Sequence, residues 1–169
     1  RPWGAALERA FCRGCAFDAI HATPEKRRCA IRIIAIDLET TGLDPLKDSI
    51  LEIGWAVWDL ARKCALKVGG GIVAGVTVPA KIEKLTGIMQ SDVTEFGRSL
   101  DGLLDEVPTF AETGAEFFAG HNVKAFDRLF LERVRVGRFG GVPWLDSYTD
   151  LPRDVAPGKL LMMCAEHGF

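Results

Sequence analysis

The sequence predicts an α/β fold in which a mixed β-sheet forms the middle of three layers and is flanked by helices. Apolar runs at residues 31–38 and 50–59 have the length and composition of buried strands. Apolar residues then recur at helical spacing through much of residues 79–135. A short strand pattern at 142–145 and a final amphipathic stretch at 159–167 follow. This order, strands first and helices after, favours a layered sheet.

The stretch after the second strand divides into a hairpin partner and a loop. Residues 64–68 read as a third strand, which a tight turn at 61–63 pairs with the second. The glycine-rich residues 69–75 follow without a helical or strand period, so we expect a flexible loop there. No G-K-[ST] follows the triple glycine, so the glycines give no support for a P-loop.

Four helices are expected in the middle of the chain. Their limits come from the spacing of apolar residues and from the glycines Gly87 and Gly120, which are suited to end a helix. The third of them has its apolar face at positions 110, 114, 117 and 118. The four helices cover residues 79–86, 100–107, 110–120 and 124–135.

Length and composition limit the class of protein. A chain of 169 residues with 48% hydrophobic residues is long enough for one domain with a buried core. The formal net charge of −2 does not indicate a nucleic-acid-binding protein. It does not exclude one, because a protein that holds its substrate through metal ions needs fewer basic residues. No apolar run approaches the roughly 20 residues of a membrane span and no signal peptide is evident, so we expect a cytoplasmic protein without membrane contact.

Residues 1–30 read as a helical amino-terminal extension, and residues 31–169 as the main domain. The extension contains Cys12, Cys15, His21 and Cys29, which could supply four zinc ligands. Their irregular spacing and the single C-x₂-C pair favour reduced thiols on a helix instead. The five cysteines of the chain are too few and too scattered for a secreted disulfide scaffold.

Two carboxylates, Asp37 and Glu39, stand at the end of the first strand. Side chains two residues apart in a strand point to the same face, so these two project together. Two negative charges at such a short separation repel each other and raise each other's pKa. A divalent cation between them relieves the repulsion. Oxygen-only ligation suits Mg²⁺ or Mn²⁺. The alternative is a solvated pair at a strand end.

Asp127 is a third candidate. On a helical wheel it falls in the middle of the apolar arc of residues 123–134, where a carboxylate needs a partner or a cation. We interpret Asp127 as a further carboxylate of the same metal site. A hydrogen bond or ion pair within the core is the alternative.

Three blocks of sequence resemble a known family. The first block carries Asp37 and Glu39 and consists of IAIDLETTGLDP and ILEIGWAVWD. The second carries Asp127 and consists of IEKLTGIMQSDV and VPTFAETGAEFFAGHNVKAFDRLFL. The third is VPWLDSYTDLPRDVAPGKLLMMCAEHGF. Over about residues 31–169 the chain resembles the DEDD superfamily of 3′→5′ exonucleases, which have an RNase H-like fold. It is most similar to the branch of the bacterial polymerase III epsilon proofreading subunit.

The resemblance implies an exonuclease that releases nucleoside monophosphates from the 3′ ends of single-stranded or frayed DNA or RNA, in association with a polymerase or replication complex. It implies two Mg²⁺ or Mn²⁺ ions. Asp37 then bridges both ions, Glu39 holds the ion that carries the attacking water, and Asp127 holds the other. Asn122 and Phe126 support the site from beneath, with core packing as the alternative for Phe126. The positions that match substrate-contacting residues are Thr40, Thr41, Gly42, Thr86, Gly87, Asn122 and Phe126.

The chain departs from the family pattern in its last motif. The family has a general-base histidine there and a fourth acidic residue a few positions later. His167 has no acidic residue after it, and Tyr148 has Pro152 where a Tyr-x₃-Asp motif needs an aspartate. We therefore expect an exonuclease domain shortened at its carboxyl end. The alternative function is a catalytically inactive module of the same fold that binds nucleic acid or a polymerase.

Overall fold

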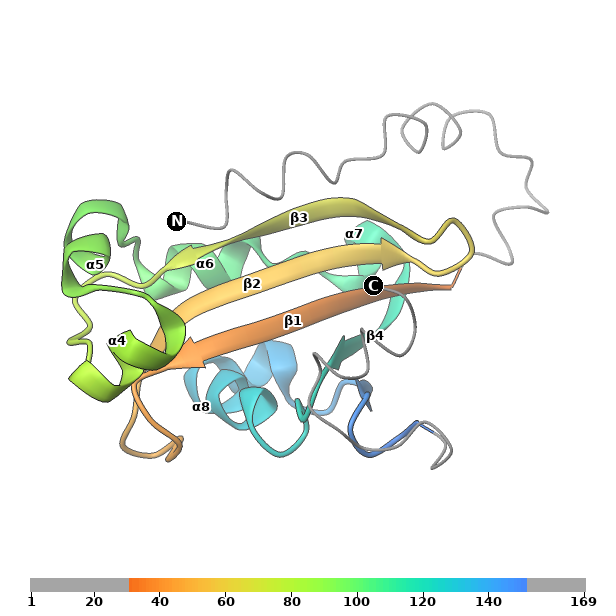
Figure 1. The fold of residues 1–169 in the computed structure, drawn as a ribbon. Coiled ribbons are helices and arrows are strands. Elements are labelled where there is room, and N and C mark those ends of the chain that lie inside the picture. Colours follow the sequence, from red (N-terminus) through yellow and green to blue (C-terminus); the bar gives the residue numbers. More distant parts are fainter. Residues whose placement is uncertain (1–30, 152–169) are drawn as a thin grey trace.

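The structure is a computed structural model that describes residues 31–151. A five-stranded sheet in the order β3-β2-β1-β4-β5 forms its centre (Figure 1). The pairs β1–β2 and β2–β3 are antiparallel, and β1–β4 and β4–β5 are parallel. This mixed sheet, flanked by helices, confirms the predicted fold class. The strands are β1 (Arg32–Thr40), β2 (Ile50–Asp59), β3 (Cys64–Ile72), β4 (Ala115–Gly120) and β5 (Trp144–Asp146).

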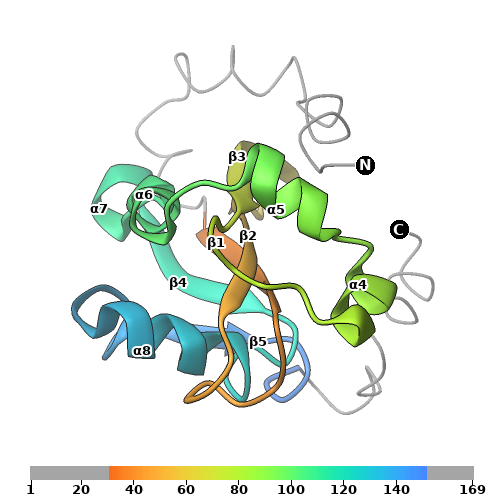
Figure 2. The same ribbon diagram turned by 90° about the vertical axis from the view of Figure 1, so that its left-hand side faces the viewer.

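The helices bury one face of the sheet and one of its ends. Figure 2 shows α6, α7 and α8 together on one side of the sheet. Side chains of α6 and α8, among them Leu103 and Phe130, join the β1 residues Ile34 and Ile36 in the main core. A second core forms around Leu51 where α4 and α5 meet the sheet. The helices are α4 (Ala80–Thr86), α5 (Gln90–Phe96), α6 (Leu100–Glu106), α7 (Phe110–Thr113) and α8 (Asp127–Phe139).

The glycine-rich segment belongs to strand β3, so the prediction of a flexible loop at 69–75 is wrong for its first part. Gly69 lies under the indole ring of Trp55, and a Cβ on Gly69 would overlap that ring. Gly70 has φ +145° and lies against the carbonyl oxygen of Ile53. The glycines therefore allow β2 and a tryptophan to approach closely, which is a known role of glycine inside strands.

The predicted helix at 110–120 is also wrong beyond its first turn. Helix α7 ends at Gly114, which adopts φ 67°, and the chain continues as β4 parallel to β1. Thr109 and Glu112 form a capping box that supports the short helix. The apolar residues Phe117 and Phe118 suit a buried strand as well as a helix, and pairing with β1 decides between them.

Helix α8 begins at Asp127, three residues later than predicted, and extends to Phe139. Asn122 precedes it with a positive φ of 59°, and Arg135 interrupts the helical geometry with φ −152° and ψ 67°. The last strand was predicted at 142–145, with Asp146 at its end. It is confirmed as β5, which begins two residues later than predicted and includes Asp146.

Several predictions lie outside the described residues. They are the helical extension at 1–30 with its four zinc-ligand candidates, and the amphipathic stretch at 159–167. Of the helices between residues 31 and 151, none combines the length and apolar character that crossing a membrane requires.

Candidate functional site

The carboxylates Asp37 and Glu39 lie near the end of β1, on the sheet face opposite the main core. Alternation along the strand produces this: Ile36 and Leu38 are buried in the core, whereas Asp37 is exposed and Glu39 is half-buried. Across the antiparallel pair, Asp37 stands opposite Gly54. The structure therefore brings the two predicted carboxylates to one face, as the strand spacing requires.

Asp127 is held beside the same strand. It is the first residue of α8 and is only 3% exposed. The backbone N–H of Leu38, which lies between the two carboxylates of β1, donates a hydrogen bond to Asp127 Oδ1 at 2.9 Å. The described structure thus links the third candidate to the strand that carries the first two, across 89 positions in sequence.

The pKa values of these groups show that they influence one another. Partial burial raises the pKa of Asp37, while the charge of His121 acts in the opposite direction. Burial, and then the charge of Asp37, raises the pKa of Glu39. Burial, followed by the charge of Asp37, raises the pKa of Asp127 to about 7, although the N–H of Leu38 lowers it.

Glu52 adds a fourth carboxylate that the sequence analysis did not single out. The β1–β2 register places it directly opposite Glu39, on the same face. Burial raises its pKa, as do the charges of Glu39 and then Asp37. The sequence shows an acidic residue in the second apolar run, but the residue of the first strand that it faces depends on the register, which the sequence alone does not fix.

The donor set fits a divalent cation. Within residues 31–151, no lysine or arginine forms an ion pair with Asp37, Glu39, Glu52 or Asp127. Carboxylate oxygens without an internal counter-charge are the ligands that Mg²⁺ and Mn²⁺ prefer. In the same range, no three acidic, histidine or cysteine side chains already converge in a metal-binding arrangement.

The turn after β1 is internally bonded. The Thr40 hydroxyl donates to the carbonyl of Gly42 at 2.6 Å, and the Thr41 hydroxyl contacts Asp48 at 3.3 Å. A Cβ on Gly42 would overlap the carboxylate of Asp48. A side chain at position 42 would therefore require the Asp48 carboxylate to move. The hydroxyls of Thr40 and Thr41, two residues predicted to contact substrate, also hold the turn itself.

Thr86 and Gly87 form the end of α4. The Thr86 hydroxyl donates to the carbonyl of Ile82 at 3.0 Å and accepts from the N–H of Ile88 at 3.1 Å. Gly87 adopts φ 76° and its N–H donates to the carbonyl of Glu83. Figure 1 shows α4 toward the end of the sheet where β1 finishes, the same end as the carboxylates.

Asn122 and Phe126 lie in the connection between β4 and α8. Asn122 is exposed, and its N–H donates to Asp146 Oδ1 at 2.8 Å. Phe126 is half-buried, packs against the main core and lies 5.2 Å from the ring of Phe130. This packing agrees with the core alternative for Phe126, and contact with substrate stays a prediction.

Asp146 orders this connection and was predicted only as the end of a strand. It is fully buried and accepts the N–H groups of Asn122, Lys124 and Tyr148 at 2.8–3.0 Å. Asp146 thereby sets the path of the chain into α8 and the position of Asp127. An aspartate directly after a strand is a weak signal, because such residues are common there.

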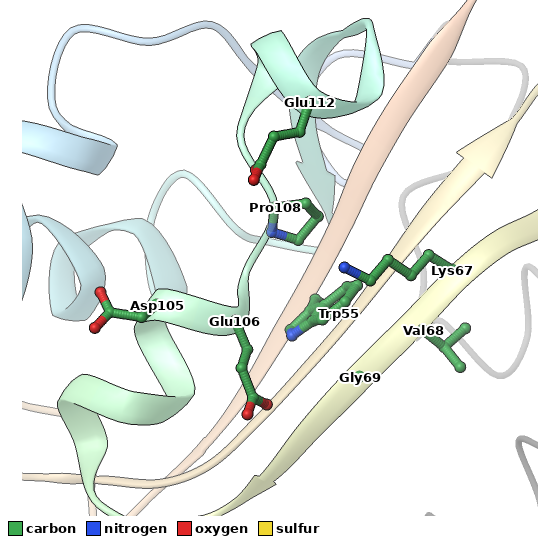
Figure 3. A pocket seen from close by; sticks show the side chains of 8 residues that line it. All are labelled: Trp55, Lys67, Val68, Gly69, Asp105, Glu106, Pro108 and Glu112. Carbon is green, nitrogen blue, oxygen red and sulfur yellow. The ribbon is translucent and has the colours of Figure 1, made fainter.

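A separate cavity of about 350 Å³ lies on the other face of the sheet (Figure 3). Trp55 and Lys67 line it from the sheet, and Glu106 and Glu112 line it from the helical side. The Lys67 ammonium lies 5.4 Å from the centre of the indole ring. None of the predicted site residues lines this cavity, because Trp55 pairs with Ile36 and so points away from the carboxylate face.

Curated relatives and solved structures support a common fold. The chain is 32% identical over 126 residues to a PolC-type DNA polymerase III of Thermotoga maritima. The match covers 69% of this chain and 8% of the relative, so the chain spans less than a tenth of that protein's length.

Two exonuclease I structures share the fold. One, from Methylocaldum szegediense, has a TM-score of 0.52 at 19% identity over 60% of this chain and 22% of that one. The other is the zinc-bound form of an E. coli exonuclease I–ssDNA complex, with a TM-score of 0.58 at 12% identity over 70% of this chain and 28% of that one.

The exonuclease family model matches residues 34–150 of this chain. The matched range contains both strands of the carboxylate face and the start of α8, so it includes all four acidic residues of the site. The family predicted from the three sequence blocks is confirmed, and the chain belongs to the exonuclease family.

Proposed function

We propose that this chain is a metal-dependent 3′→5′ exonuclease that hydrolyses the terminal phosphodiester bond of single-stranded or frayed nucleic acid and releases nucleoside monophosphates. One observation carries the proposal. Asp127 on α8 is bonded to the backbone between Asp37 and Glu39, and no lysine or arginine of the described chain pairs with any of the three.

Asp37, Glu39 and Asp127 are the residues that would hold two Mg²⁺ or Mn²⁺ ions. When bound, such ions lower the pKa of a water and stabilise charge on the phosphate and on the leaving oxygen. The protein positions the ligands: β1 fixes the separation of Asp37 and Glu39, and the Leu38 N–H fixes Asp127. Glu52 adds negative charge beside Glu39, which favours cations at this end of the sheet.

The turn formed by Thr40, Thr41 and Gly42 and the end of α4 at Thr86 and Gly87 are the proposed contacts for the terminal nucleotide. Both lie toward the carboxylate end of the sheet, and both offer backbone groups on rigid turns. Contacts of this kind hold the end of a nucleic-acid strand without recognising its base sequence. The E. coli exonuclease I structure that shares this fold was solved with single-stranded DNA, which favours a single-stranded substrate here.

A polymerase or replication complex is the proposed partner. The Thermotoga maritima relative is a PolC-type DNA polymerase III many times longer than this chain. The similarity supports an exonuclease that works beside a polymerase, either within one chain or as a separate subunit.

A labelled single strand incubated with Mn²⁺ tests the proposal. The strand carries the label at its 5′ end in one reaction and at its 3′ end in another. We expect stepwise shortening of the 5′-labelled strand and immediate release of labelled mononucleotide from the 3′-labelled one. Both activities should disappear in Asp37→Ala. Binding without shortening would contradict the proposal and support an inactive nucleic-acid-binding module.

A further inference from the structure

His121 lies in line with Asp37 across the parallel part of the sheet. The register pairs Ala35 with Ala119, and β4 ends one residue later at Gly120. Continued for two residues, this register places His121, the first residue after β4, beside Asp37 of β1. The β4–β5 register pairs Gly120 with Asp146, which places Ser147 next to His121. Asp37, His121 and Ser147 therefore form a row across the end of the sheet.

The imidazole of His121 is held in place from the β5 side. Its Nδ1 lies 2.9 Å from the Ser147 hydroxyl. The Ser147 N–H donates to the carbonyl of Gly120 at 2.9 Å, so the ladder between the two strands continues one residue past the end of β5 and supports this contact. Tyr148 packs edge-on against the imidazole, with ring centres 5.6 Å apart and planes at 82°.

The second ring nitrogen of His121, Nε2, is available to bind a ligand at the candidate site. Nδ1 is taken up by Ser147, which leaves Nε2 as the ring nitrogen that can bind a ligand. Within residues 31–151, Nε2 makes no hydrogen bond. The charge of His121 lowers the pKa of Asp37, so the two groups lie within electrostatic reach. When Ser147 donates its hydroxyl proton to Nδ1, the ring proton resides on Nε2, which is then a hydrogen-bond donor.

We infer that His121 is a substrate-binding residue of the proposed nuclease site, and that its Nε2–H donates a hydrogen bond to a non-bridging oxygen of the phosphate bound beside Asp37. The inference rests on the proposed function. A phosphate that approaches four carboxylates needs hydrogen-bond donors as well as cations, and the His121 imidazole, held by Ser147, can supply one. Ser147 is a positioning residue that selects the tautomer.

Binding of thymidine 5′-monophosphate in the presence of Mg²⁺ tests the inference directly. Glutamine can place an amide N–H close to the position of Nε2, whereas alanine cannot. We expect His121→Ala to weaken binding by about tenfold to a hundredfold, the range for one hydrogen bond to a charged group. His121→Gln should stay within about threefold of the wild type, and Ser147→Ala should fall between the two. The measurement is a calorimetric titration, with Mn²⁺ affinity and thermal midpoint checked for each variant.

A ¹⁵N-edited imidazole spectrum of the wild-type chain gives a second readout that does not depend on any variant folding. The His121 signals, assigned by their loss in His121→Gln, should show a protonated Nε2, and this signal should shift when the mononucleotide is added. A proton on Nδ1, or an Nε2 signal that does not respond, would overturn the inference. Equal affinity of His121→Ala and the wild type would do the same.

The failure of this inference can be told apart from the failure of the proposed function. If the wild-type chain releases mononucleotides and His121→Ala has the same KM and kcat, only the role of His121 is refuted. If the wild-type chain neither binds Mn²⁺ nor releases mononucleotides, both proposals fall together.

Discussion

Asp127 and Asp146 are both buried aspartates near one end of the sheet, but the protein satisfies them differently. Asp146 accepts three backbone N–H groups from the two connections around it. Asp127 accepts one from Leu38 and faces the charge of Asp37, and its pKa is raised to about 7. A carboxylate surrounded by N–H donors stabilises the fold, whereas one surrounded by other carboxylates is left for a ligand.

The largest expected effect comes from removing the charge of Asp127. Asp127→Asn keeps the volume and can still accept from Leu38, but it removes a negative oxygen from the site. We expect the rate of mononucleotide release to fall by about 10³-fold or more, equivalent to the loss of several kcal/mol of metal-assisted stabilisation. Asp101→Asn on α6 is the matched control, because that carboxylate is exposed and paired with Arg135. A variant that retained a tenth of the wild-type rate would contradict the assignment.

Asp146→Ala should act on stability instead. It removes the acceptor of three N–H groups, in a region where the side chain is fully buried. We expect the free energy of unfolding to fall by at least about 3 kcal/mol, since each of the three unsatisfied buried groups costs about 1–3 kcal/mol. Urea unfolding measures this. Asp105→Ala, which removes an exposed partner of Arg135, should change the same quantity by less than about 1 kcal/mol. Equal losses in the two variants would remove the distinction between the two aspartates.

The pH dependence of stability sharpens the comparison further. The pKa of Asp127 is raised from 3.8 to about 7 on folding, so the folded chain binds this proton more tightly than the unfolded chain. Without metal, the contribution of Asp127 to the free energy of unfolding is therefore most favourable below about pH 4, and it is lost as the pH rises through 7. Asp127→Asn lacks this ionisation, so its free energy of unfolding should exceed that of the wild type at pH 8 by about 4 kcal/mol, with no gain at pH 4. Urea midpoints in EDTA at both pH values provide the measurement, and parallel pH profiles would contradict it.

Glu52 should have the smallest effect. It lies directly opposite Glu39 on the neighbouring strand. Removing its charge should weaken the attraction for a bound cation by roughly 1 kcal/mol, at the effective dielectric of a partly exposed site. Glu52→Gln should therefore weaken Mn²⁺ binding about fivefold. Glu116→Gln, an exposed change on β4, is the control and should leave the affinity unchanged. A loss as large as that of Asp127→Asn would mean that Glu52 is a principal ligand.

Much of the carboxylate strand could be predicted from sequence. The apolar runs before and after Asp37 and Glu39 are long and nearly continuous, which favours buried strands, and β2 was predicted with its observed limits. The sheet face that the two carboxylates share follows from the strand period alone. The helical pattern indicated that Asp127 is a buried carboxylate suited to a metal site. Its position beside Leu38 could not be derived, because nothing local links residues 89 positions apart.

The errors have physical causes of two kinds. The β3 glycines look like a loop in isolation, and they are tolerated in a strand because Trp55 and the β2 backbone occupy the space that side chains would fill. The 110–120 segment has helical spacing, but pairing with β1 outweighs that local preference after Gly114. Glu52 and the His121–Ser147 contact depend on strand register, which becomes readable only once the neighbouring strands are known.

Binding of Mn²⁺ by calorimetry at pH 7.5 tests the central claim most directly, because it requires neither a substrate nor turnover. The carboxylates at the end of β1 should bind the cation together with Asp127, and protons should be released as Asp127 ionises. We predict clear binding by the wild type and by Asp101→Asn, and a loss of at least about tenfold in Asp127→Asn. Equal Mn²⁺ affinity in the wild type and Asp127→Asn would contradict the account.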